Sequence, residues 1–431
     1  LDTEDWDTRS LVYCSAMFYN CIITQAYVAA VGDYVWDMSS VTTVGNMFNN
    51  CDGLTDGASL PVGDWDTSSV LYMSRFVKYC GNLTEFRGDD WDFSSMLECY
   101  DMFMSCPKLA TIDTTAWRFP VATRTSSLFN GCVLLETNTT PCKINVTNLF
   151  LKADGSHSTA ITDINSMFAS CKLLTAIDVS NWDVTNVTTC SSIFSKCYAL
   201  TNAGVAGVAM WNNDGAGSGN PSTTAKLEVV AGMFYDNRTL TTIPIGVNAA
   251  GAPWVGPSVT NMDQMFRICT GLTALDVSAF NTANVTSMTR VFAACNSLET
   301  IDVQAWNVSS ATSLRSLFEG CTALDDLGTN GGGTHIGVKN WDVSSLLLAG
   351  GLFHTCVSLP SGAIDVSDWD TSSITDTSWM FYNSNVGNIV VTDWDVGDLI
   401  DMTGMFHGAN IVTLDISAWN TSPSSTAQVR G

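Results

Sequence analysis

The stretch Trp182-Asp-Val-Thr-Asn-Val-Thr-Thr-Cys190-Ser-Ser-Ile-Phe194-Ser-Lys-Cys197 defines a unit that recurs along the whole chain. With the tryptophan counted as zero, apolar side chains stand at +5, +8, +11 and +12, and a cysteine stands at +15. Self-similarity at a fixed spacing is the signature of repeat architectures. The interval from tryptophan to cysteine keeps one length in every copy, so we expect it to be the rigid part of each repeat.

Fourteen copies align in two columns, and a fifteenth begins at Trp419. The +15 column contains Cys21, Cys51, Cys80, Cys106, Cys132, Cys171, Cys197, Asn237, Cys269, Cys295, Cys321, Cys356, Ser384 and Ala409. The zero column contains Trp6, Trp36, Trp65, Trp91, Trp117, Ser156, Trp182, Ser222, Trp254, Phe280, Trp306, Trp341, Trp369 and Trp394. Only Ser156 and Ser222 interrupt the aromatic column, and both follow insertions.

The segment that follows each cysteine varies in length and reads, in a compact copy, Leu174-Thr-Ala-Ile177-Asp178-Val179-Ser180. Its alternating apolar residues suit a short strand, whereas Ser-x-Met-Phe-x-x-Cys, with apolar residues three and four apart, suits one or two helical turns. One coil cannot bury its own apolar face, so coils must stack. The sequence predicts an α/β repeat solenoid of about 14–15 coils, with a parallel β-sheet and short helices. We expect a single domain over residues 1–431, irregular near 137–156, 203–222 and 326–340.

The repeat resembles a known family. The pattern Trp-Asp-Thr-Ser-x-Val-x-x-Met-x-x-Met-Phe-x-x-Cys-x-x-Leu is similar to the BspA-like leucine-rich repeats of bacterial and protist surface proteins. It is most similar to their surface-lipoprotein type, whose repeat length is the spacing from Trp65 to Trp91. The stretches at 65–70 and 369–374 carry the resemblance most fully. The resemblance implies a right-handed leucine-rich-repeat-like solenoid, extracellular display, and a role in adhesion or surface structure; it implies no catalytic residues.

Composition limits the classes of partner. The formal net charge is −24, from 42 acidic and 18 basic residues, and the sequence shows no basic patch, so we expect no nucleic-acid partner and no adhesion to anionic membranes. No apolar run reaches 18 residues, which argues against direct membrane insertion of this chain. A surface of hydroxyls and carboxylates suits an extracellular or cell-surface protein. The chain starts inside a coil, without an initiator methionine or a signal peptide, so we expect a processed or incomplete product.

Fifteen cysteines would usually indicate disulfides in an extracellular protein. Here some copies have Asn, Ser or Ala at +15 in place of cysteine. Cys14, Cys99 and Cys190 stand at +8, where other copies have Met, Val or Ile. Such substitutes are expected for buried residues and not for disulfide partners. Stacked cysteines would also point side by side, which makes bridging awkward. We therefore expect a buried thiol ladder made of Cys21, Cys51, Cys80, Cys106, Cys132, Cys171, Cys197, Cys269, Cys295, Cys321 and Cys356. Cys142, in an irregular coil, is the candidate for a real disulfide.

An aspartate follows the aromatic residue in many copies, and five copies read Asp-Trp-Asp. Stacking would bring these carboxylates about 5 Å apart, at about 3 kcal/mol per neighbour for an effective dielectric of 20. The first interpretation is an Asx turn, in which the carboxylate accepts a nearby backbone N–H. The alternative is Ca²⁺ bridging between coils, with candidate ligands Asp5, Asp7, Asp64, Asp66, Asp90, Asp92, Asp368, Asp370, Asp393 and Asp395. No other metal site is expected, because C-x-x-C pairs are absent and the four histidines are scattered: His157, His335, His354 and His407.

Sequons supply candidate glycosylation sites. These are Asn82, Asn138, Asn145, Asn186, Asn284, Asn307 and Asn420. Asn307 and Asn420 stand at the surface position after tryptophan and are the better candidates. A further sequon at Asn237 falls in the +15 column, where we expect burial. The number of sequons is close to that expected by chance.

Two functions fit these features. No nucleophile–base set, phosphate loop or paired-acid pocket stands out, so we expect neither an enzyme nor a cofactor. The first function is an extracellular structural protein with an adhesive role, which assembles with itself head-to-tail into a filament or surface layer. Its basis is that residues 1–6 and 414–421 do not resemble capping coils. The alternative is a monomeric ectodomain that binds a host or neighbouring-cell protein or glycan through its strand face or edge loops. Insertions at 210–220 and 329–334 favour it, although neutral drift in loops explains them equally well.

Overall fold

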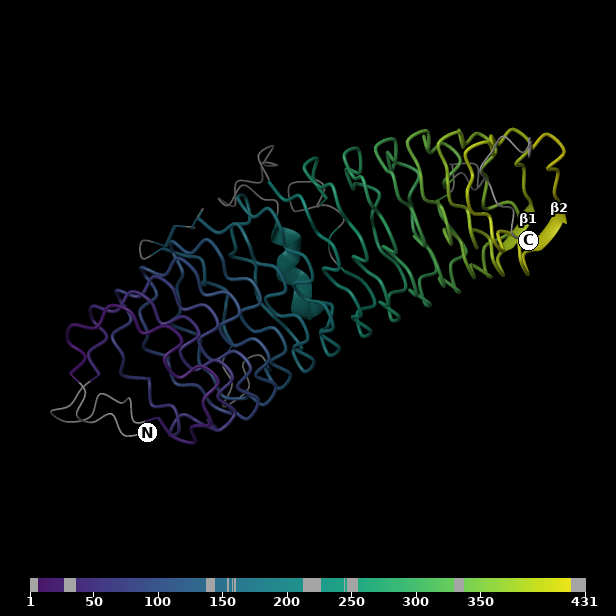
Figure 1. Cartoon of the computed structure of the whole chain (residues 1–431). Coiled ribbons are helices and arrows are strands. Elements are labelled where there is room, and N and C mark those ends of the chain that lie inside the picture. Colours follow the sequence, from purple (N-terminus) through teal and green to yellow (C-terminus); the bar gives the residue numbers. More distant parts are fainter. Residues whose placement is uncertain are drawn as a thin grey trace. The chain divides into compact units, whose positions relative to one another are not determined.

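The computed structural model describes residues 7–26, 36–136, 144–152, 155–156, 158, 160–211, 226–243, 245, 255–328 and 337–419. The chain divides into two compact units, Leu1–Leu227 and Glu228–Gly431. Within each unit the backbone forms coils that lie side by side (Figure 1). The repeat architecture is therefore confirmed for each unit. A single solenoid over residues 1–431, and its right-handedness, stay predictions.

Parallel backbone bridges join successive coils at the +7 position, so the fixed spacing in the sequence corresponds to a fixed register in space. In unit 1 the bridged residues are Tyr13, Thr43, Tyr72, Glu98, Arg124, Asp163 and Thr189. In unit 2 they are Val229, Asn261, Ser287, Ser313, Leu348, Asp376 and Asp401. Within the described residues the expected parallel sheet is reduced to these single bridges, a few others like them, and one parallel pair of strands, β1 (Asn385–Asn388) and β2 (Asn410–Thr413), seen at the yellow end of Figure 1.

The prediction of helical turns in Ser-x-Met-Phe-x-x-Cys is wrong for the described residues. In residues 262–269, two linked four-residue turns are closed by the amide of Met265 on the carbonyl of Met262 (3.1 Å) and by the amide of Cys269 on that of Phe266 (3.0 Å). The third residue of each turn has a φ of 58° or 64°, as a type II turn requires. Apolar residues three and four apart fit linked turns as well as a helix, so the spacing alone could not separate them.

Four other amides of this segment bond to the next coil. Those of Met262, Gln264, Phe266 and Ile268 donate to carbonyls in residues 287–293 at 2.8–3.0 Å. Some N–H groups of the segment thus close a turn within the coil, and others donate to carbonyls of the next coil in the stack. The turns therefore form a continuous hydrogen-bonded column without a helix.

In the two copies without an aromatic residue in the predicted column, a residue other than the expected serine occupies the zero position. Trp211 stacks on Trp182, with 6.1 Å between ring centroids, and follows the short 3-10 helix η1 (Ala203–Met210), drawn in teal in Figure 1. Trp211 therefore replaces the expected Ser222, because the insertion of that coil lies after the tryptophan and not before it. Ser222 itself falls outside the described residues.

Leu149 takes the corresponding place in the other interrupted copy, instead of Ser156. Its amide donates to the carbonyl of Val146 at 3.0 Å, as the amide of Trp182 donates to that of Val179 at 3.1 Å. A count of fifteen residues back from Cys171 gives Ser156, whereas the interval from Leu149 to Cys171 is longer because this coil carries an insertion inside it.

The core of each unit is a stack of aromatic rings. In unit 2 the indoles of Trp306, Trp341, Trp369 and Trp394 follow one another at 6.4–6.5 Å and within 10° of parallel. Each buried indole N–H needs an acceptor, and that of Trp394 donates to the carbonyl of Val366 in the preceding coil at 3.1 Å. Packing and hydrogen bonding therefore both favour the same register between coils.

Candidate functional site

The cysteines at +15 form a hydrogen-bonded ladder. The thiol of Cys295 donates to the carbonyl of Phe266 in the preceding coil at 3.1 Å, and Ser384 makes the same bond to Phe353 through its hydroxyl. Equivalent thiol bonds are made by Cys51, Cys80, Cys106, Cys132, Cys171, Cys197, Cys269, Cys321 and Cys356. Cys21 is half-buried, the cysteines of the described part form no disulfide, and Cys142 lies outside that part.

Burial also makes these thiols poor nucleophiles. Desolvation raises the pKa of Cys51 to about 11 and the pKa values of Cys197 and Cys269 to about 12. In the +8 column Cys14, Cys99 and Cys190 are buried as well. Since the thiolate is the reactive form of cysteine, the ladder is suited to structure and not to covalent catalysis.

The aspartates that follow tryptophan form Asx turns. A carboxylate oxygen of Asp66 accepts the amide of Ser68 at 3.0 Å, and Asp370 accepts that of Ser372 at 3.1 Å. Hydrogen bonds from the side chain and backbone of Ser372 lower the pKa of Asp370. The same turn is made by Asp92, Asp342 and Asp395.

These acids do not gather into a metal site where the structure describes them. No group of three or more His, Cys, Asp or Glu in the described ranges is placed to hold an ion. Asp7 pairs with Arg9 at 2.7 Å, and Asp368 lies 3.6 Å from Lys339. Three more carboxylates are exposed, those of Asp64, Asp90 and Asp393. Asp5 lies outside the described residues.

The candidate glycosylation sites differ in accessibility. Asn307 and Asn284 are exposed. The side-chain nitrogen that would carry a glycan donates to a carbonyl at 2.8 Å in both Asn82 and Asn284. Asn237 is fully buried. Two more are half-buried, Asn145 and Asn186, and two lie outside the described residues, Asn138 and Asn420.

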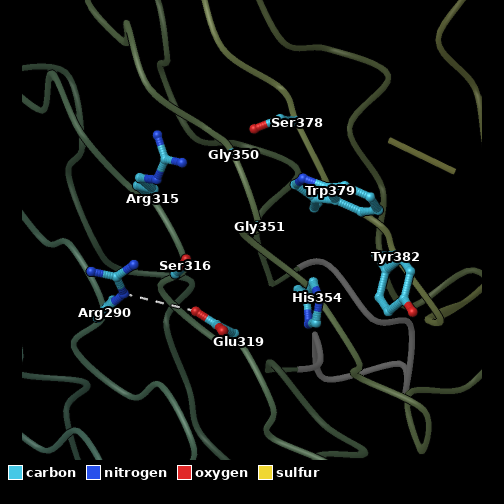
Figure 2. Close-up of a pocket in the computed structure, with 10 residues that line it drawn as sticks. All are labelled: Arg290, Arg315, Ser316, Glu319, Gly350, Gly351, His354, Ser378, Trp379 and Tyr382. Atoms are coloured by element: carbon cyan, nitrogen blue, oxygen red, sulfur yellow. Dashed lines mark ion pairs between the residues drawn. The ribbon is translucent and has the colours of Figure 1, made fainter. Parts of the chain in front are cut away.

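A groove of about 480 Å³ opens in unit 2 on the face formed by the +9, +10 and +13 residues, which we call the turn face. Gly350 and Gly351 lie between its two walls (Figure 2). A Cβ at Gly350 would lie 2.9 Å from the carboxylate of Asp376. Gly351 has a φ of +67°, and its Cβ would lie 2.9 Å from the hydroxyl of Ser316. A larger residue at either position would displace these polar side chains, and at Gly351 it would also have to adopt a positive φ that favours glycine.

Two arginines and Glu319 form one wall of the groove. Arg315 donates to Asp376 at 2.6 Å, while Nε of Arg290 lies 3.8 Å from the carboxylate of Glu319 (Figure 2). Both arginine side chains are more than two-fifths exposed. The wall therefore presents hydrogen-bond donors and acceptors to solvent, and each of its arginines has a carboxylate beside it.

Aromatic rings form the opposite wall (Figure 2). Trp379 packs edge-on against Tyr382, with 5.3 Å between centroids, and Tyr382 stacks on His354 at 4.6 Å. The backbone of Gly404 lies against the Trp379 ring, where a Cβ would overlap the indole. The indole is held in one place by these contacts and is still 40% exposed.

The backbone of Trp379 is unusual for so large a residue. Its φ is 57°, in the left-handed region, which costs a bulky side chain about 1–2 kcal/mol relative to a permitted conformation. The corresponding +10 residues of unit 2 are mostly small or flexible: Gly232, Gln264, Arg290, Ser316, Gly351 and Gly404. Because the indole is largely outside the core, packing does not explain its presence there. The left-handed backbone is shared by this turn position in the other coils, so what distinguishes Trp379 is its exposed indole and not its φ.

Sequence reasoning missed this groove. Of its lining residues it considered only His354, and only as one of four scattered histidines. The available signal was the +10 column, in which Trp379 is the one aromatic residue among the described copies. The edge insertion at 329–334 lies outside the described residues, as does the one at 210–220 from residue 212 onward.

Comparisons place the chain in a family. None of the helices that the structure describes combines the length and hydrophobicity of a membrane span.

A search of the curated proteins gave no match. Among solved structures, the chain is similar to a leucine-rich repeat protein from Bacteroides ovatus, with 14% identity over 86% of this chain and 78% of that one and a TM-score of 0.32. It is also similar to a leucine-rich cell surface protein from Faecalibacterium prausnitzii, with 16% identity over 69% of this chain and 84% of that one and a TM-score of 0.26.

A third similar structure is a leucine-rich repeat protein from Leptospira interrogans, with 11% identity, coverage of 88% and 86%, and a TM-score of 0.19. Because these identities and TM-scores are low, the description of the fold rests on the coils of this structure and not on the similar structures. A sequence family described as Mycoplasma protein of unknown function, DUF285, matches residues 29–141, 146–216, 228–356 and 351–429. These segments cover most of the chain, which therefore belongs to the DUF285 family.

Proposed function

We propose that this protein is a non-enzymatic repeat scaffold at the cell surface that binds a partner through the turn-face groove of unit 2. The observation that carries the proposal is Trp379, a half-exposed indole at a left-handed backbone position, opposite two arginines across a glycine floor. Tryptophan, tyrosine and arginine are the residues that most often dominate binding energy. A repeat scaffold would hold them rigidly, so little entropy is lost on binding.

Several features support a location outside the cell. The acidic, hydroxyl-rich composition suits a secreted protein, and the repeat resembles those of BspA-like surface proteins. Free cysteines in an oxidising compartment survive when they are buried and protonated, as Cys197 and Cys269 are. Antibody labelling of intact and permeabilised cells tests the location. Equal labelling of intact and permeabilised cells supports the proposal, and labelling only after permeabilisation contradicts it.

Adhesion of protein-coated beads to a panel of host and neighbouring cells tests the binding role. Trp379→Gly removes the indole and places at φ 57° the residue best suited to that conformation. Gln264→Gly makes the same kind of change at another +10 position of unit 2, outside the groove. We expect Trp379→Gly to abolish adhesion and Gln264→Gly to preserve it. Equal adhesion of both variants would refute a role for the groove.

Head-to-tail self-assembly, the other function expected from the sequence, stays a prediction. Light scattering and negative-stain electron microscopy of the purified full chain test it. Filaments whose length grows with concentration would support assembly, and monodisperse particles at all concentrations would contradict it.

A further inference from the structure

We infer that the groove of unit 2 binds a neutral saccharide, with one pyranose ring stacked on Trp379 and neighbouring hydroxyls bonded to the wall of Arg290, Arg315 and Glu319. The inference rests on the proposed binding function and specifies its ligand. It follows from three properties of the groove: its aromatic surface, its mixture of donors and acceptors, and its charge balance.

The aromatic wall offers a flat surface of the kind that sugar rings use. The indole of Trp379 is fixed between Tyr382 and Gly404 and remains 40% exposed. The face of an aromatic ring carries partial negative charge, and the C–H groups of a pyranose ring carry partial positive charge. A saccharide can therefore cover the indole without leaving a buried polar group unpaired, because its hydroxyls point outward from the ring edge.

The opposite wall matches those hydroxyls. A sugar hydroxyl donates one hydrogen bond and accepts others, so neighbouring hydroxyls bind best where donors and acceptors alternate. Arg290 supplies donors beside the carboxylate of Glu319, at a separation of 3.8 Å that leaves both groups exposed. Arg315 holds Asp376 and presents its remaining N–H groups. Ser316 and Ser378 lie between the walls but are buried, and the hydroxyl of Ser378 donates to Asp376 at 2.6 Å, so the wall side chains supply the bonds to a ligand.

The charge of the groove favours a neutral ligand over an acidic one. Each arginine of the wall is accompanied by a carboxylate, Arg315 by Asp376 and Arg290 by Glu319. The chain as a whole carries a net charge of −24, which repels anions. Glu319 and the negative charge of the chain would repel the carboxylate of a uronic or sialic acid, whereas a neutral sugar would not be repelled. The volume of about 480 Å³ lies in the range of small-ligand sites.

Calorimetric titration of the full chain with named sugars tests the inference. The panel contains the neutral disaccharides maltose, cellobiose, lactose and mannobiose, and one disaccharide with a glucuronate ring. We expect at least one neutral disaccharide to bind one-to-one and the glucuronate sugar to bind at least tenfold more weakly. Trp379→Gly should weaken the neutral sugar by tenfold or more, and Arg290→Gln should weaken it as well, while Gln264→Gly should leave it unchanged. Circular dichroism confirms that each variant is folded.

Other outcomes overturn the inference. Binding that survives Trp379→Gly would place the sugar elsewhere, and preference for the glucuronate sugar would exclude the neutral class. If no sugar binds at ten-millimolar concentration while Trp379→Gly still abolishes bead adhesion, the ligand is not a saccharide but the groove still binds a partner. If no sugar binds and adhesion is unchanged in Trp379→Gly, both the inference and the proposed function fail.

Discussion

Substitution of Cys295 tests whether the thiol ladder stabilises the stack. Its thiol is buried and donates to the carbonyl of Phe266 at 3.1 Å, and that carbonyl also accepts the amide of Cys269 at 3.0 Å. Cys295→Ala removes the donor and the sulfur atom. Cys295→Ser removes the sulfur but keeps a donor, as Ser384 does at the same position of a later coil.

The expected losses in free energy of unfolding can be estimated. Loss of the hydrogen bond costs about 1 kcal/mol, since the carbonyl keeps one of its two partners. Loss of one buried apolar atom, with the cavity left behind, costs about 1–2 kcal/mol. Cys295→Ala should therefore lower stability by about 2–3 kcal/mol, and Cys295→Ser by about 1 kcal/mol less.

Urea unfolding followed by tryptophan fluorescence measures the two losses. The same pair of substitutions at Cys321, whose thiol donates to Phe292 at 3.1 Å, repeats the comparison in the next coil. We expect serine to be the milder substitution at both sites. A serine variant that is as unstable as the alanine variant, or more so, would refute the role assigned to the hydrogen bond.

Three further predictions follow from the described side chains. Burial raises the pKa values of Cys197 and Cys269 to about 12, from an ordinary value near 9. The contribution of these protonated thiols to folding stability is therefore complete below pH 9 and is lost as the pH rises towards 12. The melting temperature should therefore fall steadily above pH 9, and a constant value up to pH 11 would contradict this. Asx turns satisfy aspartates such as Asp66 and Asp370 without a metal, so excess EDTA should leave the melting temperature unchanged; a fall of several degrees would indicate bridging Ca²⁺. In a glycosylating host, peptide mapping should find any glycan on exposed Asn307 and none on buried Asn237, and a modified Asn237 would contradict its burial.

The sequence was sufficient to predict which residues pack together. Residues that share a column, such as Trp369 and Trp394, stack on each other because a constant spacing leaves only one register that buries every apolar position. It was not sufficient to distinguish linked turns from helix, since both place the +8, +11, +12 and +15 side chains inside. Asn46 and Asn50 have φ values of 58° and 59°, and the asparagines and glycines of these two columns were the clue that favoured turns.

The candidate site was not predicted, for a different physical reason. Aligning the copies reveals residues that are alike at equivalent positions. The groove is formed by residues that differ from those at equivalent positions, namely Trp379 and the consecutive glycines at 350 and 351. Its walls come from coils that the stack brings together, such as those of Arg290 and Tyr382. Only the three-dimensional register shows that they line one space.

The most direct test of the stacked coils is a distance between spin labels on the outer edge of unit 2. Asn281 and Asp395 each follow the aromatic residue of their coil, four coils apart. Cysteines there can be labelled selectively in a Cys21→Ser, Cys142→Ser background, because the other thiols are buried. Parallel coils about 4.8 Å apart give a narrow distribution near roughly 20 Å. A broad distribution, or a separation well beyond 30 Å by the same spacing, would contradict the stack.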